Sequence, residues 1–328
     1  MAGQEAEFVL GEVCFRTMDG FRYYHVSGPC DHSRIPETFG VLGQRINDSL
    51  TGAKAGLVGP EVARYLDAVP GTTWTLQVGH QLTNEAEESP GGAEIEELPP
   101  FRCAAMVYQG GVGHFAEAIG RLSEAVKLQC LELGREYREH YLYWEGPDSP
   151  NNVMLLQFGV ADPPGGRMDL PETPAATFGP VRIQSMQGFD YLHVDAEADM
   201  QRLGGAINEL MGKLVAAQRA GDVRAVGPVC FVYRDAGHPG LFTLEVGVPV
   251  APGTPAPAGA KVRQVEAARV ASLVYTGGLE HLAKANDALM EQVRELGLDI
   301  PGEYREWYHC FECSKSPNNV TQVMFVIR

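Results

Sequence analysis

Basic residues are scarce in this 328-residue chain, which has 26 lysines and arginines against 42 aspartates and glutamates and a formal net charge of −16. Such a surface repels the phosphates of nucleic acids, so we expect no nucleic-acid partner. Long apolar runs are also missing, since no segment approaches the roughly 18 apolar residues that a membrane span needs. The first residues lack a basic segment followed by an apolar one, as a secretory leader would have. These absences predict a soluble cytoplasmic protein with no membrane partner.

Cysteine is infrequent too, and the odd count of seven argues against a disulfide framework. Cys310 and Cys313 form a lone Cys-x-x-Cys pair, whereas a structural zinc site usually has a second ligand pair at a fixed spacing. The glycines at 110, 111 and 113 resemble a phosphate-binding loop, but no Lys-Ser/Thr pair follows them. We therefore predict no metal and no cofactor.

What the sequence does contain is an internal repeat. Six motifs recur in the same order at an offset of about 167 residues. They are Phe-x-Tyr-x-His-Val at 21–26 and 189–194, Val-Gly-Pro at 58–60 and 226–228, Leu-x-Val-Gly at 76–79 and 244–247, Val-Tyr-x-Gly-Gly at 107–111 and 274–278, Tyr-Arg-Glu-x-Tyr at 137–141 and 304–308, and Ser-Pro-Asn-Asn-Val at 149–153 and 316–320. Over the last ~60 residues of each copy about 25 positions are identical, which indicates duplication of a whole domain and not a solenoid.

The repeat sets the expected domain boundaries. We predict one copy over residues 8–160, a Pro/Gly-rich linker over 161–175 and a second copy over 176–328. Tandem fusion commonly joins in one chain what was once a homodimer, so we expect a monomer with pseudo-two-fold symmetry. Pro/Gly-rich breaks at 88–92 and 251–257 divide each copy into two half-units.

The periodicity of apolar residues predicts the elements of a half-unit. Residues 101–108 alternate as a strand does, and residues 112–133 have apolar side chains at helical spacing. Two more strands are expected at 137–144 and 153–160. The first half-unit shows a strand at 21–26, a helix at 36–50 and a strand at 74–81. The fold class is therefore predicted as α+β, with β-α-β-β half-units whose helices cover one face of antiparallel sheets.

Two β-α-β-β half-units with the Val-Tyr-x-Gly-Gly and Tyr-Arg-Glu-x-Tyr signatures resemble the bacterial GyrI-like domain. This domain also forms the effector-binding part of some AraC-type and MerR-type regulators, including multidrug-sensing ones. The resemblance covers each copy, and no helix-turn-helix segment precedes it. It implies a stand-alone protein that sequesters or senses a small hydrophobic or cationic organic molecule.

The resemblance also implies a ligand cleft between the half-units, lined by aromatic residues and by an acid on the strand after the last helix. The matching acids are Glu139 and Glu306. Several members carry a second acid in the final strand, and residues 154–157 and 321–324 have none, which argues against dications.

The residues themselves point to the same two acids. Strand alternation places Tyr137, Glu139 and Tyr141 on one face, and the second copy repeats them as Tyr304, Glu306 and Tyr308. Burying a carboxylate costs several kcal/mol unless it is paired. Such a group can attract a cation, or act as a general acid or base once burial raises its pKa. The alternative is an exposed edge strand with a solvated glutamate.

Further ligand-binding candidates are aromatic or acidic residues near the expected clefts. They are Tyr23, Trp74, Tyr108, Tyr191, Glu245, Tyr275 and Trp307. Because Gln77 of the first copy is matched by Glu245 of the second, we expect the second cleft to prefer the more cationic ligand.

Two other functions stay open. Some stand-alone members that this chain resembles hydrolyse antibiotics bearing a strained cyclopropane ring. In that case Glu139 or Glu306 would activate a water molecule, while a neighbouring tyrosine, such as Tyr137 or Tyr304, would donate a proton. The third possibility that the resemblance implies is a protein-interaction module that docks on an enzyme such as a topoisomerase.

Overall fold

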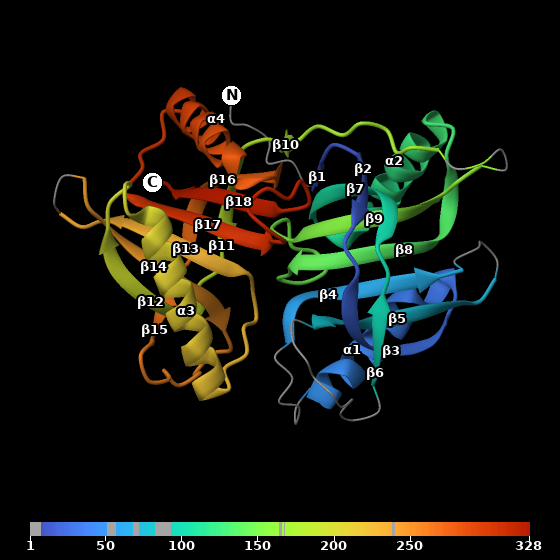
Figure 1. Cartoon of the computed structure of the whole chain (residues 1–328), viewed down its shortest axis with the longest axis horizontal. Helices are drawn as coiled ribbons and strands as arrows, with labels where there is room; N and C mark the ends of the chain where they lie inside the picture. The colour runs from blue at the N-terminus through green and yellow to red at the C-terminus, as the bar shows by residue number, and fades with distance from the viewer. Residues whose placement is uncertain are drawn as a thin grey trace. The chain divides into compact units, whose positions relative to one another are not determined.

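The computed structural model describes residues 8–50, 57–67, 72–82, 93–163, 166, 168–237 and 240–328. The chain divides into two compact units, an N-terminal unit of residues Glu7–Pro174 and a C-terminal unit of residues Ala175–Arg328 (Figure 1). Within the described ranges, no helix is long and apolar enough to cross a membrane. The predicted break at 88–92 lies outside the described residues.

In the N-terminal unit the described residues form one antiparallel sheet and two α-helices. In chain order they are β1 (Phe8–Leu10), β2 (Cys14–Met18), β3 (Phe21–Cys30), η1 (His32–Arg34), α1 (Ile35–Leu50), β4 (Leu57–Leu66), β5 (Trp74–Leu82), β6 (Glu94–Leu98), β7 (Phe101–Gly110), η3 (Val112–His114), α2 (Phe115–Leu128), β8 (Glu132–Tyr143) and β9 (Val153–Ala161). The strand order is β1-β7-β9-β8-β4-β5-β3-β6, and β2 also pairs with β7. The predicted half-units are thus β3-α1-β4-β5 and β7-α2-β8-β9, and the β4–β8 pair joins them into one sheet.

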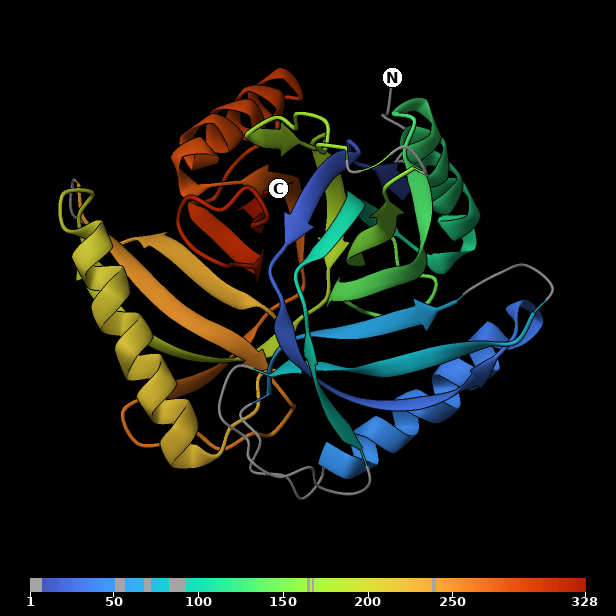
Figure 2. The ribbon, with the colours of Figure 1, turned by 45° about the vertical axis from the view of Figure 1, so that its right-hand side comes forward.

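The C-terminal unit repeats this arrangement. Its elements are β10 (Ala176–Phe178), β11 (Arg182–Met186), β12 (Phe189–Ala198), α3 (Leu203–Gly221), β13 (Val229–Asp235), β14 (Phe242–Val250), β15 (Lys261–Val265), β16 (Ala268–Gly277), η4 (Leu279–His281), α4 (Leu282–Glu295), β17 (Glu303–Cys310) and β18 (Val320–Val326). The order β10-β16-β18-β17-β13-β14-β12-β15 matches that of the first unit strand for strand, with β11 beside β16. Figure 2 shows the strongly twisted sheet of each unit with its helices.

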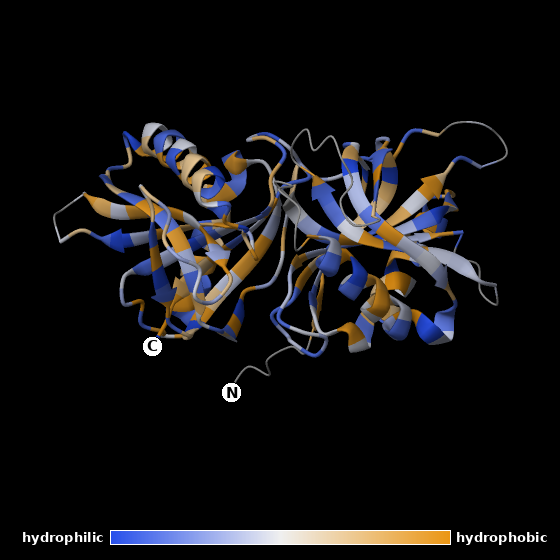
Figure 3. Cartoon of the chain, turned by 90° about the horizontal axis from the view of Figure 1, so that it is seen from below, coloured by the Kyte–Doolittle hydropathy of each residue, from blue (hydrophilic) through white to orange (hydrophobic). Residues whose placement is uncertain are grey.

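Both helices of a unit pack on the same face of its sheet. In the N-terminal unit α1 contacts β3 and β5, and α2 contacts β7, β8 and β9. Leu42 and Ile46 of α1 share one core cluster with Leu122 and Val126 of α2. In the C-terminal unit, α3 and α4 cover two neighbouring core clusters. Apolar and polar residues alternate along the strands (Figure 3), as expected when successive side chains point to opposite faces.

The repeated Leu-x-Val-Gly motif has a packing cause. A Cβ atom at Gly79 would lie 2.0 Å from the carbonyl oxygen of Tyr24, and one at Gly247 would lie 2.2 Å from that of Leu192. The neighbouring strand therefore approaches too closely for any side chain at these two positions.

Two elements differ from the sequence-based expectation. Strand β4 was not predicted, because its Val-Gly-Pro segment at 58–60 interrupts the pattern; Gly59 has φ 142°, and the register shifts between Leu57 and Glu61. The helix expected over 112–133 is also too long. It ends at Leu128, and Cys130 adopts a left-handed conformation with φ 57°, so that β8 begins at Glu132.

Candidate functional site

The two acids that the repeat singles out lie at the centre of the helix-covered sheet faces. Directly paired residues of neighbouring strands share a face. In the N-terminal unit one such row crosses five strands and has Glu139 in the middle; it consists of Val78, Ala63, Glu139, Leu156 and Met106. The matching row of the C-terminal unit is Val246, Phe231, Glu306, Val323 and Leu273.

Glu139 and Glu306 are only 3% exposed, and β8 and β17 are interior strands. The alternative of a solvated glutamate on an edge strand is therefore wrong.

Phenol groups surround the carboxyl of Glu139. The hydroxyls of Tyr65 and Tyr141 donate to its Oε2 atom over 3.0 and 2.7 Å. Tyr137, the direct cross-strand partner of Tyr65, lies on the same face. Its hydroxyl is buried and favours the charged form of Glu139, but it makes no hydrogen bond of ordinary geometry. We call these four residues the N-terminal carboxyl–phenol cluster.

The C-terminal carboxyl–phenol cluster consists of Glu306, Tyr233, Tyr304 and Tyr308. Tyr233 and Tyr308 donate to Oε2 of Glu306 over 2.9 and 2.7 Å, and Tyr304 lies 2.9 Å from Oε1. The Tyr304 hydroxyl is also 2.6 Å from the side-chain amide of Asn286 on α4. All three phenols of this cluster therefore contact the carboxyl within hydrogen-bond distance.

Burial dominates the electrostatics of both clusters. Desolvation raises the pKa of Glu139 and of Glu306 above the ordinary glutamate value, and the phenol hydrogen bonds oppose this only in part. Desolvation and the adjacent carboxylate likewise raise the pKa of the surrounding tyrosines, such as Tyr141 and Tyr304. Among the described residues no lysine, arginine or histidine pairs with either glutamate. The ionised clusters thus carry a buried negative charge without a counter-charge.

A second acid on the same strand provides a contrast. Glu303 lies three residues before Glu306, and it forms ion pairs with Arg305 over 2.5 Å and with Arg234 over 2.9 Å. Although burial opposes ionisation, these two guanidinium groups hold the pKa of Glu303 below its ordinary value. Glu136 has two arginine partners in the same way. Strand β17 therefore carries one compensated and one uncompensated acid.

Aromatic rings adjoin each cluster. The ring of Tyr141 packs 5.4 Å from Phe39 and 5.1 Å from Trp144. In the C-terminal unit Tyr308 is 4.8 Å from Phe231 and 6.1 Å from Phe311. Trp144 is 41% exposed and Phe311 is 51% exposed, so each cluster has one large aromatic side chain at the protein surface.

The repeated Ser-Pro-Asn-Asn motif forms the loop that follows these surface aromatics. Asn152 accepts a hydrogen bond from the backbone N–H of Glu145 over 2.8 Å and donates to the carbonyl of Gly146 over 2.7 Å. Asn319 makes the equivalent bonds to Glu312 and Cys313, over 2.9 and 2.7 Å. The motif is therefore a loop brace that fixes the chain beside Trp144 and Phe311.

Three other candidates lie on the helix-covered face. Tyr108 and Tyr275 are at most 1% exposed; Tyr108 donates to the carbonyl of Gly111 and packs against Phe115. Trp74 is also buried and shares the core cluster of Tyr65. The described contacts place these aromatics within the core, and their part in ligand binding stays a prediction.

Three further aromatic candidates lie on the opposite face of the sheets. The hydroxyls of Tyr23 and Tyr191 donate to the carbonyls of Val62 and Cys230, both over 2.7 Å. Trp307 alternates with Glu306 along β17 and is fully buried. The structure does not bring these residues together with the carboxyl–phenol clusters.

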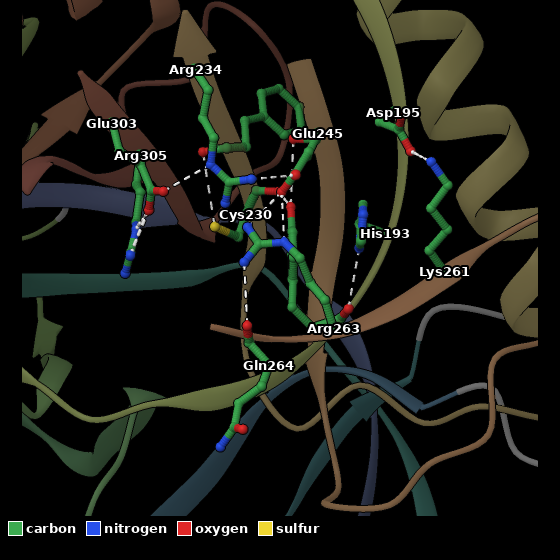
Figure 4. Close-up of polar contacts among 12 residues, drawn as sticks. His193, Asp195, Cys230, Arg234, Glu245, Lys261, Arg263, Gln264, Glu303 and Arg305 are labelled. Atoms are coloured by element: carbon green, nitrogen blue, oxygen red, sulfur yellow. Dashed lines mark hydrogen bonds and ion pairs between the residues drawn. The ribbon is translucent and has the colours of Figure 1, made fainter. Parts of the chain in front are cut away.

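Glu245 also lies on the opposite face. It forms ion pairs with Arg234 over 2.8 Å and with Arg263 over 2.6 Å (Figure 4). The matched residue Gln77 accepts a hydrogen bond from Arg64 over 2.6 Å. Glu245 is therefore a compensated acid remote from Glu306, and it gives no reason for the C-terminal site to prefer the more cationic ligand.

Sequence reasoning missed Tyr65, Tyr233 and Asn286. Tyr65 and Tyr233 lie on strands β4 and β13, of which β4 is interrupted by glycine and proline. Their common offset in the repeat was the signal that could have identified them. Asn286 had no such signal, because the first copy has Ile119 at the matching position.

The residues that the structure describes contain no group of three or more His, Cys, Asp or Glu side chains placed to hold a metal ion. Cys310 and Cys313 are both free thiols.

Residues 179–328 match the family model of the GyrI-like small molecule binding domain. No curated protein is significantly similar to the chain. Similar solved structures include SAV2435 bound to tetraphenylphosphonium, with 8% identity over 45% of this chain and 94% of that chain (TM-score 0.38). The C-terminal domain of EcmrR shows 17% identity over 47% and 99% (TM-score 0.40). A hydrolase encoded by lin2189 from Listeria innocua shows 13% identity over 45% and 91% (TM-score 0.31).

The family match covers the C-terminal unit, while the N-terminal unit repeats its motifs and its strand order. The C-terminal unit is therefore a GyrI-like domain, and the N-terminal unit is a second copy of the same fold.

Proposed function

We propose that each unit binds a lipophilic organic cation and sequesters it, with Glu139 or Glu306 as the counter-charge. One observation carries this proposal. Each glutamate is buried among phenols without a cationic partner in the described parts of the chain, whereas Glu136 and Glu303 on the same strands each have two arginines. A cationic ligand would supply the missing charge.

The expected interaction energy is large enough to matter. At an effective dielectric constant of about 20, a single positive charge about 5 Å from a carboxylate gains about 3 kcal/mol. Desolvation of the ligand offsets part of this gain. Aromatic faces add about 0.5–2 kcal/mol each when they contact the cation, and Tyr141 with Trp144 or Tyr308 with Phe311 can provide them. The combination favours a monocation with apolar or aromatic substituents.

Calorimetric titration with tetraphenylphosphonium tests the proposal, with triphenylphosphine oxide as the neutral control. We expect the double variant Glu139→Gln/Glu306→Gln to bind the cation about 30-fold more weakly, corresponding to about 2 kcal/mol. The matched control is Glu132→Gln/Glu291→Gln, which removes two exposed charges from β8 and α4. Unchanged cation affinity in the first double variant, or equal losses in both, would show that the buried carboxylates are not the anchor.

A second candidate function is hydrolysis of a strained, electrophilic ring. It is favoured by the raised pKa of each glutamate beside phenol donors, which is the pairing that general acid–base catalysis needs. Mass spectrometry of a cyclopropane-bearing alkylating compound incubated with a small amount of protein distinguishes the two functions. Many ring openings per protein molecule, lost in the Glu139→Gln/Glu306→Gln variant, would indicate catalysis. Depletion limited to the amount of protein would support binding alone.

A further inference from the structure

The two clusters differ at one helix position that faces the carboxyl. In the C-terminal unit Asn286 of α4 lies 2.6 Å from the Tyr304 hydroxyl. The matching position on α2 is Ile119, which packs against the core and offers no polar atom. Tyr137 therefore lacks the amide partner that Tyr304 has, and its buried hydroxyl has no hydrogen-bond partner among the described residues.

This difference changes how each carboxyl is occupied. Tyr304 has one hydroxyl proton, so when it donates to Oε1 of Glu306, the side-chain N–H of Asn286 donates to the Tyr304 oxygen. Both carboxyl oxygens of Glu306 then accept phenol hydrogen bonds. In the N-terminal unit both phenol bonds converge on Oε2 of Glu139, and within the described ranges none reaches Oε1. Glu139 thus keeps one oxygen without a donor.

We propose that the two units select different cations, an inference that rests on the proposed function. The N-terminal cluster takes a protonated amine, whose N–H donates to Oε1 of Glu139. The C-terminal cluster takes a fully substituted ammonium or phosphonium ion, which is held by charge and ring faces alone. The physical reason is hydrogen-bond matching, because a buried donor or acceptor left unpaired is costly. An N–H ligand meets an unoccupied oxygen in the first cluster and a fully engaged carboxyl in the second.

A matched pair of probes tests the inference. Protonated benzyldiethylamine and benzyltriethylammonium have the same charge, and they differ only in that an ethyl group replaces the N–H. Each is titrated by calorimetry against Glu306→Gln, which keeps only the N-terminal cluster intact, and against Glu139→Gln, which keeps only the C-terminal one. We expect the first protein to bind the protonated amine about tenfold more tightly, corresponding to about 1.4 kcal/mol. The second protein should show no such preference, or the reverse.

Exchange of the helix residue provides the second arm. In the Glu306→Gln background, Ile119→Asn should engage Tyr137 and reduce the preference for the N–H ligand. In the Glu139→Gln background, Asn286→Ile should create that preference.

Equal selectivity ratios in the two single-site proteins, or ratios that do not respond to these exchanges, would overturn the inference. Failure of both benzyl cations to bind either protein would overturn it too. Tetraphenylphosphonium titration of the same proteins then decides separately whether the proposed function stands.

Discussion

Replacing Glu306 by glutamine should make the ligand-free protein more stable at neutral pH. Burial raises the pKa of Glu306, so the folded state disfavours its charged form. The group therefore contributes its full stability only below the ordinary glutamate pKa, and this contribution is lost as the pH rises through the elevated folded-state pKa. Glutamine keeps the shape and an acceptor for the phenols of Tyr304 and Tyr308 but carries no charge.

The size of the effect follows from linkage. Each unit by which the folded-state pKa exceeds the unfolded value corresponds to about 1.4 kcal/mol at a pH well above both values. In a domain of about 150 residues, 1 kcal/mol shifts the melting temperature by about 2–4 °C. Calorimetric melting of wild type and Glu306→Gln between pH 4 and pH 8 measures this difference. We expect a gain at pH 7 to 8 that shrinks toward zero near pH 4.

A less stable variant at neutral pH would refute this reasoning. It would mean that the hydrogen bonds from Tyr233, Tyr304 and Tyr308 stabilise the carboxylate by more than burial destabilises it. A difference that does not change between pH 4 and pH 8 would refute it as well, because the effect would then not come from the titration of Glu306. Either result would remove the uncompensated charge on which cation binding depends.

Three further outcomes are expected from the same structure. Glu303→Gln should behave in the opposite sense, because its pKa is lowered: the variant should lose about 1–3 kcal/mol of stability at neutral pH by leaving the buried Arg305 short of a partner, and the loss should fade as the pH drops through the pKa of Glu303 in thermal melts. Gly247→Ala should cost more than about 3 kcal/mol or prevent folding, since its Cβ atom has no room beside the adjacent strand, and soluble yield with circular dichroism measures this. Asn319→Ala should destabilise the chain by about 1–3 kcal/mol by leaving the backbone N–H of Glu312 without its acceptor, as urea titration would show; a change below about 0.5 kcal/mol would contradict the loop-brace assignment.

The second half-unit could be predicted from the sequence because its pattern is local. Residues 101–160 alternate clearly in the strands and follow helical spacing between them, and β7, α2, β8 and β9 were all expected. Glu139 could be singled out because strand alternation and the repeat agree on it. The first half-unit was harder, because Gly59 and Pro60 interrupt β4, and this strand carries Tyr65 into the cluster.

The face of the sheet was the other limit. Trp307 could have been excluded, because it alternates with Glu306 along one strand. For Tyr23 and Glu245 the sequence gives no such reference: the side that each side chain faces depends on cross-strand register, which only the folded sheet defines. The partners of Glu245 are likewise long-range, since Arg263 comes from an edge strand of the same sheet.

The arginine network behind each sheet shows a different tolerance for sequence change from the cluster in front of it. Arg64 of β4 is matched by Val232, while the corresponding arginine of β13 is Arg234, two residues further along and therefore on the same face. Both arginines nevertheless reach the matching acid, Glu136 or Glu303. The two copies have thus kept the front of the sheet residue by residue while exchanging ion-pair donors on the back. Within a single chain, duplication has separated the residues that must hold their position from those that need only a neighbour of opposite charge.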